Sequence, residues 1–114
     1  MTLHTRQDFD RVYKSQKRWH SSHFVLFFRE NAQHKRVGFS VSKKVGNAVC
    51  RNRIKRRLRA VYRESMLDLV SGDMILLAKS GLDKVAYKTL QNNYEYALAR
   101  LGLRDGKSSL SFCD

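Results

Sequence analysis

The sequence has few cysteines and no long apolar segment. Only Cys50 and Cys113 occur among 114 residues, and they form neither a disulfide framework nor the paired spacing of a metal site. No apolar run approaches the roughly 18 residues of a membrane-spanning helix, and no signal peptide opens the chain. These absences exclude a disulfide scaffold and a transmembrane protein, so we expect a protein of the reducing cytoplasm.

Acidic residues are also scarce, with ten Asp and Glu against 23 Lys and Arg, and the net charge of +13 implies an acidic partner. The acids are scattered and show neither a metal-nuclease pattern nor a two-metal site. His20 and His23 could act as general acid and base, but a structural or solvated role is favoured for such a pair. No serine lies in a nucleophile elbow. The polypeptide is therefore predicted to bind and not to catalyse, with no catalytic residue.

The positive charge is concentrated between Lys43 and Arg63, which hold nine Lys or Arg and no acid. Apolar residues recur within this stretch at steps of four, four and three, which places them on one face of a helix over about Ala48–Ser65. Asn47 is a good N-cap for this helix. The apolar stripe is Cys50, Ile54, Leu58 and Val61, and the residues predicted to point away from it are Arg51, Arg53, Lys55, Arg56, Arg59 and Arg63.

A helix with this charge is expected to face a polyanion. Like charges at helical neighbour spacing each destabilise by about 0.2–0.5 kcal/mol, so packing must hold the helix. Phosphates of a nucleic acid favour such a surface through counterion release. A solvated charged face usually mixes signs. A helix that lies on an anionic membrane usually carries bulky Trp, Phe or Leu on its buried face, whereas this stripe has a Cys and β-branched residues, as a protein core would. We therefore expect a nucleic-acid partner and no membrane.

The remaining elements follow from periodicity and turn signals. A short first helix places Phe9 and Tyr13 on one face, and Thr5 with Asp8 resembles a capping box. Gly102 is suited to end the last helix. A further short strand near residues 19–22 is left open. The predicted elements are a helix over 6–15, strands over 23–29 and 36–42 joined by a hairpin-like polar loop over 30–35, an interior strand over 73–79, and a helix over 87–101.

The strand over residues 36–42 has two unlike faces. Val37, Phe39 and Val41 form a core face, whereas Gly38, Ser40 and Ser42 form a face of small residues. Beside an aromatic such as Phe27 on a neighbouring strand, the small face would make a shallow groove for a single-stranded segment. A plain solvent-exposed face is the alternative.

This order of elements predicts an α+β fold, a two-layer sandwich of helices on a small mixed sheet. One domain is expected over residues 1–104. Residues 105–114 form a polar tail that we expect to be flexible.

The central run GFSVSKKVGNAVCRNRIKRRLR, Gly38–Arg59, resembles the signature of the bacterial ribonuclease P protein subunit family, with its Arg-Asn-Arg motif at Arg51, Asn52 and Arg53. Asp8–Lys14 resembles the first helix of that family. The similarity extends from about Thr5 to Leu101. The central run contains no insertion, so the resemblance is specific.

The resemblance implies a partner, a reaction and a topology. Family members pair with a large catalytic RNA, which uses Mg²⁺ to remove the 5′ leader of precursor tRNA. The family fold resembles a ribosomal-protein domain and has a left-handed crossover, against the general preference. No DNA partner is expected. By resemblance, the residues facing the catalytic RNA are Lys43, Lys44, Arg51, Asn52, Arg53, Lys55, Arg56 and Arg59, and those of the leader-binding cleft are Phe9, Tyr13 and Phe27.

Two positions depart from the family pattern. Gln16 stands where Gly is usual after the first helix, which puts the local turn in doubt. Arg57 stands where an apolar residue is common, and we expect its side chain to snorkel outward from the edge of the stripe. The alternatives to this assignment are a ribosomal or ribosome-assembly RNA-binding protein and a protein-only nuclease.

Overall fold

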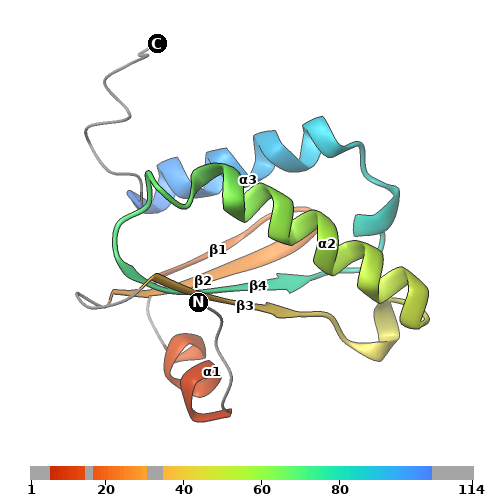
Figure 1. Ribbon diagram of the computed structural model, residues 1–114, viewed down its shortest axis with the longest axis horizontal. Coiled ribbons are helices and arrows are strands. Elements are labelled where there is room, and N and C mark those ends of the chain that lie inside the picture. The colour runs from red at the N-terminus through yellow and green to blue at the C-terminus, as the bar shows by residue number, and fades with distance from the viewer. Residues whose placement is uncertain (1–5, 15–16, 31–34, 104–114) are drawn as a thin grey trace.

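The computed structural model describes residues 6–14, 17–30 and 35–103, and the side chain of Asp8 lies outside the description. The predicted capping box at Thr5, the turn at Gln16 and the tail over 105–114 also lie outside it. The helices and strands, shown in Figure 1, are α1 Arg6–Tyr13, β1 Lys17–His20, β2 Phe24–Glu30, β3 Lys35–Ser40, the 3-10 turn η1 Lys43–Val45, α2 Ala48–Ser65, β4 Gly72–Ala78, the 3-10 turn η2 Leu82–Lys84, and α3 Tyr87–Leu101.

The four strands form one mixed sheet in the order β1-β2-β4-β3. β2 is antiparallel to both β1 and β4, whereas β3 is parallel to β4. The predicted interior position of β4 is confirmed. The hairpin predicted for residues 30–35 is wrong because β4 lies between β2 and β3, and each of them pairs with it. The short strand that the sequence left open is β1, which begins two residues earlier than expected.

The parallel pair β3 and β4 is joined through α2. In Figure 1 the chain leaves β3 at the front edge of the sheet, passes over the upper face as α2, and enters β4 behind β3. This path is a left-handed crossover, as the resemblance implied. Two side chains of β3 support the connection: Lys35 Nζ donates to the Met66 carbonyl, 3.1 Å away, at the end of α2, and the Arg36 guanidinium makes two hydrogen bonds of 2.9 Å to the carboxylate of Asp73.

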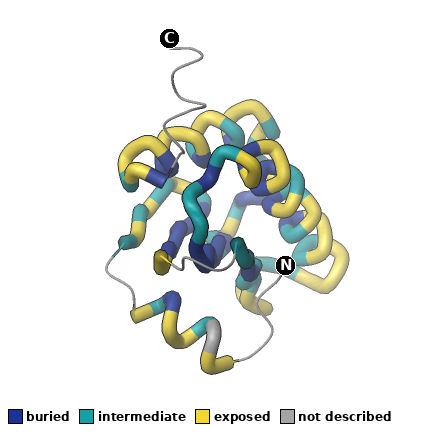
Figure 2. Tube along the Cα trace, turned by 60° about the vertical axis from the view of Figure 1, so that its left-hand side comes forward, coloured by how far each residue is buried: buried dark blue, intermediate teal, exposed yellow. Residues whose placement is uncertain are grey.

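The sheet carries helices on both faces, with α2 and α3 above it and α1 below it in Figure 1. Phe24, Leu26 and Phe28 of β2 pack on the side of α2 and α3, and Val25 and Phe27 pack with α1 on the other side. Figure 2 shows the buried strands between helices whose outward sides are exposed. The α+β class and the mixed sheet are therefore confirmed, and α1 adds cover to the second face.

Local signals set the ends of the two long helices. The Asn47 side chain accepts a hydrogen bond of 2.9 Å from the Cys50 amide, so the predicted N-cap of α2 is confirmed. At the end of α3, Gly102 has φ 67 and its amide bonds to carbonyls of the last turn. Both helices cover the residues predicted for them.

Candidate nucleic-acid interface

Helix α2 divides its residues between the core and a basic outer surface. Ile54, Leu58 and Val61 are at most 1% exposed. Cys50 is only half-buried, so the first residue of the stripe is partly accessible to solvent. The predicted interface residues that are exposed are Lys43 and Lys44 on η1 and Asn52, Arg53, Arg56 and Arg59 on α2, with Arg51 and Lys55 half-buried at the sides. The exposed Arg63 extends this basic surface by one turn.

The carboxylates that the structure describes do not neutralise this surface. Glu64 is the single acid of α2, and its carboxylate accepts hydrogen bonds of 3.0 Å from the Tyr87 hydroxyl and 2.8 Å from Gln91 Nε2 on α3. Within the described ranges no carboxylate forms an ion pair with the basic residues of α2. The positive potential of α2 is therefore available to an external anion.

Two arginines of the basic surface are held in place by neighbours. Arg51 Nη1 donates to the Gly46 carbonyl, 3.0 Å away, just before the helix begins. The guanidinium carbon of Arg59 lies 5.7 Å from the centre of the Phe39 ring on β3. Because both contacts restrict the side chains in the free protein, less conformational entropy remains to be lost when they bind.

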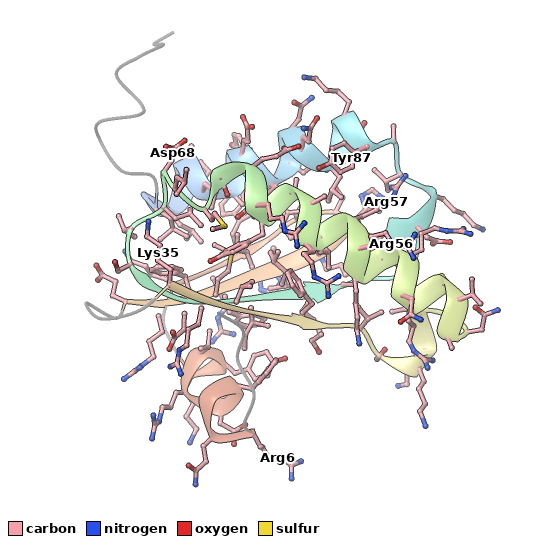
Figure 3. The ribbon with its side chains drawn as sticks, viewed as in Figure 1. Arg6, Lys35, Arg56, Arg57, Asp68 and Tyr87 are labelled. Atoms are coloured by element: carbon pink, nitrogen blue, oxygen red, sulfur yellow. The ribbon has the colours of Figure 1, made fainter. Side chains whose placement is uncertain are left out.

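Arg57 does not belong to this surface, and the prediction that it snorkels outward is wrong. Its Nη1 donates to the carbonyl oxygens of Leu82, 3.4 Å away, and of Val85. Figure 3 labels Arg57 beside Arg56 on α2, near the segment between β4 and α3. Arg57 lies at the border of the apolar stripe, and the η2 turn supplies acceptors there that the sequence of the helix could not reveal.

On the opposite face of the sheet, Phe9, Tyr13 and Phe27 form one aromatic cluster, as predicted. The ring centres of Phe9 and Tyr13 are 6.2 Å apart, and Tyr13 and Phe27 form an edge-to-face pair with centres 4.9 Å apart. Phe9 and Tyr13 are half-buried, whereas Phe27 is only 8% exposed. The cluster combines packing of α1 on the sheet with a partly accessible aromatic surface.

The small-residue face of β3 shares this side of the sheet, but it does not adjoin Phe27. Phe27 pairs with Ile75 on β4, and Ile75 pairs with Gly38 on β3. Ile75 is fully buried between them. The predicted direct neighbourhood of Phe27 and Gly38 is therefore wrong, because β4 lies between β2 and β3.

One basic residue beside the aromatic cluster was missed. Arg18 lies directly opposite Phe27 in the β1–β2 register, and its guanidinium carbon is 5.4 Å from the centre of the Phe27 ring. The alternation of Lys17, Arg18, Trp19 and His20 would have indicated it if the segment had been read as a strand, because Arg18 and Trp19 then face opposite sides.

The described residues offer no constellation for chemistry. No group of three or more His, Cys, Asp or Glu side chains lies close enough within them to hold a metal ion. His20 is exposed and His23 is half-buried. Partial burial raises the pKa of the Cys50 thiol, and a hydrogen bond that the thiol donates to the Asp83 carboxylate raises it further. Both effects disfavour the thiolate needed for metal binding or attack. Among the helices that the structure describes, none is long and apolar enough to cross a membrane.

The fold and this surface define a small basic α+β domain of the kind that binds nucleic acid, with its positive charge on a crossover helix. Comparison with known proteins identifies the family. The family described as Ribonuclease P matches residues 1–102, and the chain belongs to this family.

Several relatives illustrate the match. The chain is 43% identical over 96 residues to the ribonuclease P protein component of Natranaerobius thermophilus, and the alignment covers 82% of this chain and 84% of the relative. Among solved structures, the RNase P protein of Staphylococcus aureus has a TM-score of 0.78 at 33% identity and covers 87% of this chain and 93% of that one. The RNase P protein of Thermotoga maritima has a TM-score of 0.76 at 28% identity, and the match covers 88% of this chain and 96% of that one. Membership implies a general role in tRNA processing, within an endoribonuclease complex.

Proposed function

We propose that this chain is the subunit that binds the catalytic RNA of ribonuclease P and the 5′ leader of precursor tRNA in the cytoplasm. The RNA performs the endonucleolytic cleavage, and the polypeptide itself is not catalytic. The observation that carries the proposal is the basic surface of α2, which is anchored by buried Ile54 and Leu58 and is not neutralised by the described carboxylates. A polyanion with closely spaced phosphates fits this surface.

The catalytic RNA is assigned to α2 and the turn before it. Arginine binds phosphate through a planar set of donors, and the exposed Arg53 and Arg56 are three residues apart on neighbouring helical positions. Local contacts orient Arg51 and Arg59 beside them. The full proposed contact set for the catalytic RNA is Lys43, Lys44, Arg51, Asn52, Arg53, Lys55, Arg56 and Arg59.

The leader of precursor tRNA is assigned to the aromatic cluster of Phe9, Tyr13 and Phe27. Base stacking on aromatic side chains contributes about 1–3 kcal/mol per base and tolerates any sequence. Tolerance of this kind suits a subunit that serves many tRNA leaders. The partly exposed rings of Phe9 and Tyr13 are the members of the cluster that support this assignment best.

The described residues do not build a magnesium site of their own. Mg²⁺ prefers octahedral oxygen ligands and is commonly bound through carboxylates and phosphates. No cluster of three acidic, His or Cys side chains occurs in the described part of the chain. We therefore assign the Mg²⁺ of the reaction to the RNA partner, and the protein contributes positive charge that lowers the concentration of Mg²⁺ the complex requires.

A cleavage assay tests the proposal. Catalytic RNA and labelled precursor tRNA are incubated at low Mg²⁺ with and without this chain, and release of the 5′ leader is followed. The chain is expected to increase the rate at low Mg²⁺, and the Arg53→Ala, Arg56→Ala double variant should not. A chain that leaves the rate unchanged but binds ribosomal RNA would instead be a ribosomal or ribosome-assembly protein. Cleavage by the purified chain alone would show a protein-only nuclease.

A further inference from the structure

Arg18 of β1 is packed onto the aromatic cluster. Its guanidinium carbon lies 5.4 Å from the centre of the Phe27 ring, and its Nη2 donates to the Tyr13 carbonyl over 3.4 Å. Tyr13 is the last residue of α1, where the unpaired carbonyls of a helix end favour a cation. Arg18 is nevertheless exposed beside the rings.

This arrangement changes what an incoming strand would meet. Phe27 makes an edge-to-face contact with Tyr13 and is overlaid by the Arg18 guanidinium, and only 8% of the residue is exposed. A base could stack directly on Phe27 only by displacing one of these neighbours. The accessible groups of this region are instead the exposed Arg18 and the half-buried Phe9 and Tyr13.

We propose that Arg18 contacts the single-stranded leader, and that Phe27 acts beneath it as a support for the guanidinium. A guanidinium is planar and weakly hydrated, so it stacks on aromatic faces and on bases and also attracts phosphate. Contact with Phe27 and the Tyr13 carbonyl orients the plane before binding, which reduces the entropy lost when RNA binds. The proposal rests on the assignment of the leader to the aromatic cluster.

The structure supplies a matched control on the other side of the same strand. Arg100 of α3 also lies over an aromatic ring, with its guanidinium carbon 5.7 Å from the centre of Trp19. Trp19 follows Arg18 in β1 and packs against the core on the side of α2 and α3, away from α1. Arg100→Ala therefore removes the same charge and the same type of contact at a site that the leader is not proposed to reach.

The test compares Arg18→Ala, Arg18→Lys and Arg100→Ala in the holoenzyme. Dissociation constants are measured for precursor tRNA with its full leader and for the same tRNA without a leader. Arg18→Ala should weaken binding of the leader-bearing tRNA about tenfold, as expected for one lost stacking contact, and leave mature tRNA unchanged. Arg18→Lys keeps the charge but not the plane, so it should restore only part of the affinity. Arg100→Ala should not change the ratio of the two constants.

The outcomes distinguish this inference from the proposed function. If the wild-type holoenzyme prefers leader-bearing tRNA and Arg18→Ala retains the full preference, Arg18 does not contact the leader, although the assignment of the leader stands. An equal loss for both tRNAs, or full rescue by Lys, would reduce Arg18 to a general electrostatic role and overturn the inference. If the wild type itself shows no preference, both the inference and the leader assignment are wrong. Melting curves of each variant verify the fold.

Discussion

The division of α2 into arginines that face solvent and one that faces the chain gives a prediction with an internal control. Arg53, Arg56 and Arg57 lie within five residues of one another and carry the same charge. Arg53 and Arg56 are exposed, whereas Arg57 is half-buried against the carbonyls of Leu82 and Val85. Substitution of each by Ala removes one positive charge from the same helix, so any difference between the variants must come from where the side chain points.

The expected magnitude for the exposed pair follows from counterion release. Each lost phosphate contact should reduce the slope of log affinity against log salt by about 0.7–0.9. The ratio of variant to wild-type dissociation constants should then shrink about threefold between about 50 and about 200 mM salt. Arg53→Ala and Arg56→Ala should each show this change in binding to the catalytic RNA, and the double variant should show about twice the change in slope.

Arg57→Ala should affect the protein in a different way. A hydrogen bond to a charged group contributes about 1.5–3 kcal/mol, and the half-buried position of Arg57 places the loss at the lower end of that range. For a domain of this size about 1 kcal/mol shifts the melting temperature by about 4–8 °C. We expect a lower melting temperature with little change in the salt slope.

The assay is a titration of labelled catalytic RNA with each variant at several KCl concentrations and constant Mg²⁺, together with thermal melts of the free proteins. Unchanged slopes for Arg53→Ala and Arg56→Ala would place these residues off the interface. A slope change for Arg57→Ala equal to theirs, with an unchanged melting temperature, would refute the geometric distinction and indicate that only the net charge of the helix matters.

Three further predictions concern the rest of the domain. Phe27→Ala should weaken binding of precursor tRNA more than binding of mature tRNA. Because Phe27 is buried, the substitution should also lower the free energy of unfolding by about 3–5 kcal/mol. Equal losses of affinity for the two tRNAs would show that Phe27 is not part of the leader site. Asp73→Ala removes the bidentate partner of Arg36. Because Asp73 is 1% exposed, denaturant melts should show that the free energy of unfolding falls by about 3 kcal/mol. A fall of less than about 1 kcal/mol would mean that water replaces the salt bridge. Burial raises the pKa of Tyr62 and of Tyr87, and Tyr87 also donates to a carboxylate. The contribution of these two groups to the unfolding free energy should therefore be constant below the unfolded tyrosine pKa of about 10 and be lost as the pH rises through the raised values. A Tyr62→Phe, Tyr87→Phe variant whose melting temperature falls equally above about pH 10 would contradict this.

The two long helices could be predicted from the sequence to the residue because their signals are local. Asn47 caps α2 through an amide three residues away, and Gly102 ends α3 by adopting the left-handed conformation that glycine favours. The apolar spacing of Ile54, Leu58 and Val61 is likewise contained within one helix. None of these features depends on what the rest of the chain does.

Strand order could not be predicted in the same way. The polar segment over residues 30–35 has the length of a hairpin loop. However, β4, which comes later in the sequence, lies between β2 and β3 in the sheet. The separation between the paired Phe27 and Ile75 is 48 positions along the chain, so no local pattern specifies their register. The position of β4 between β2 and β3 also explains why Gly38 lies two strands away from Phe27 and not beside it.

The candidate site divides along the same line. The aromatic pair of Phe9 and Tyr13 could be predicted because residues four apart share a helix face. Arg57 could not, because its acceptors come from a distant segment, whereas Arg18 required residues 17–20 to be recognised as a strand. Arg18 meets Phe27 through the pairing of β1 with β2, and Arg57 meets acceptors that follow β4. Side chains at the border between the core and solvent are decided by such tertiary partners.

The charge repulsion within α2 can be compared with the free energy that packing of its apolar stripe contributes. Six pairs of basic residues on α2 lie three or four apart, and at about 0.2–0.5 kcal/mol each they destabilise the helix by about 1–3 kcal/mol. The pairs are Arg51–Lys55, Arg53–Arg57, Lys55–Arg59, Arg59–Arg63, Arg53–Arg56 and Arg56–Arg59. Burial of the three fully buried side chains of the stripe, Ile54, Leu58 and Val61, contributes about 4.5–9 kcal/mol at about 1.5–3 kcal/mol each. Packing therefore exceeds repulsion without any neutralising acid, so the domain can keep the whole charge of α2 for its RNA partner.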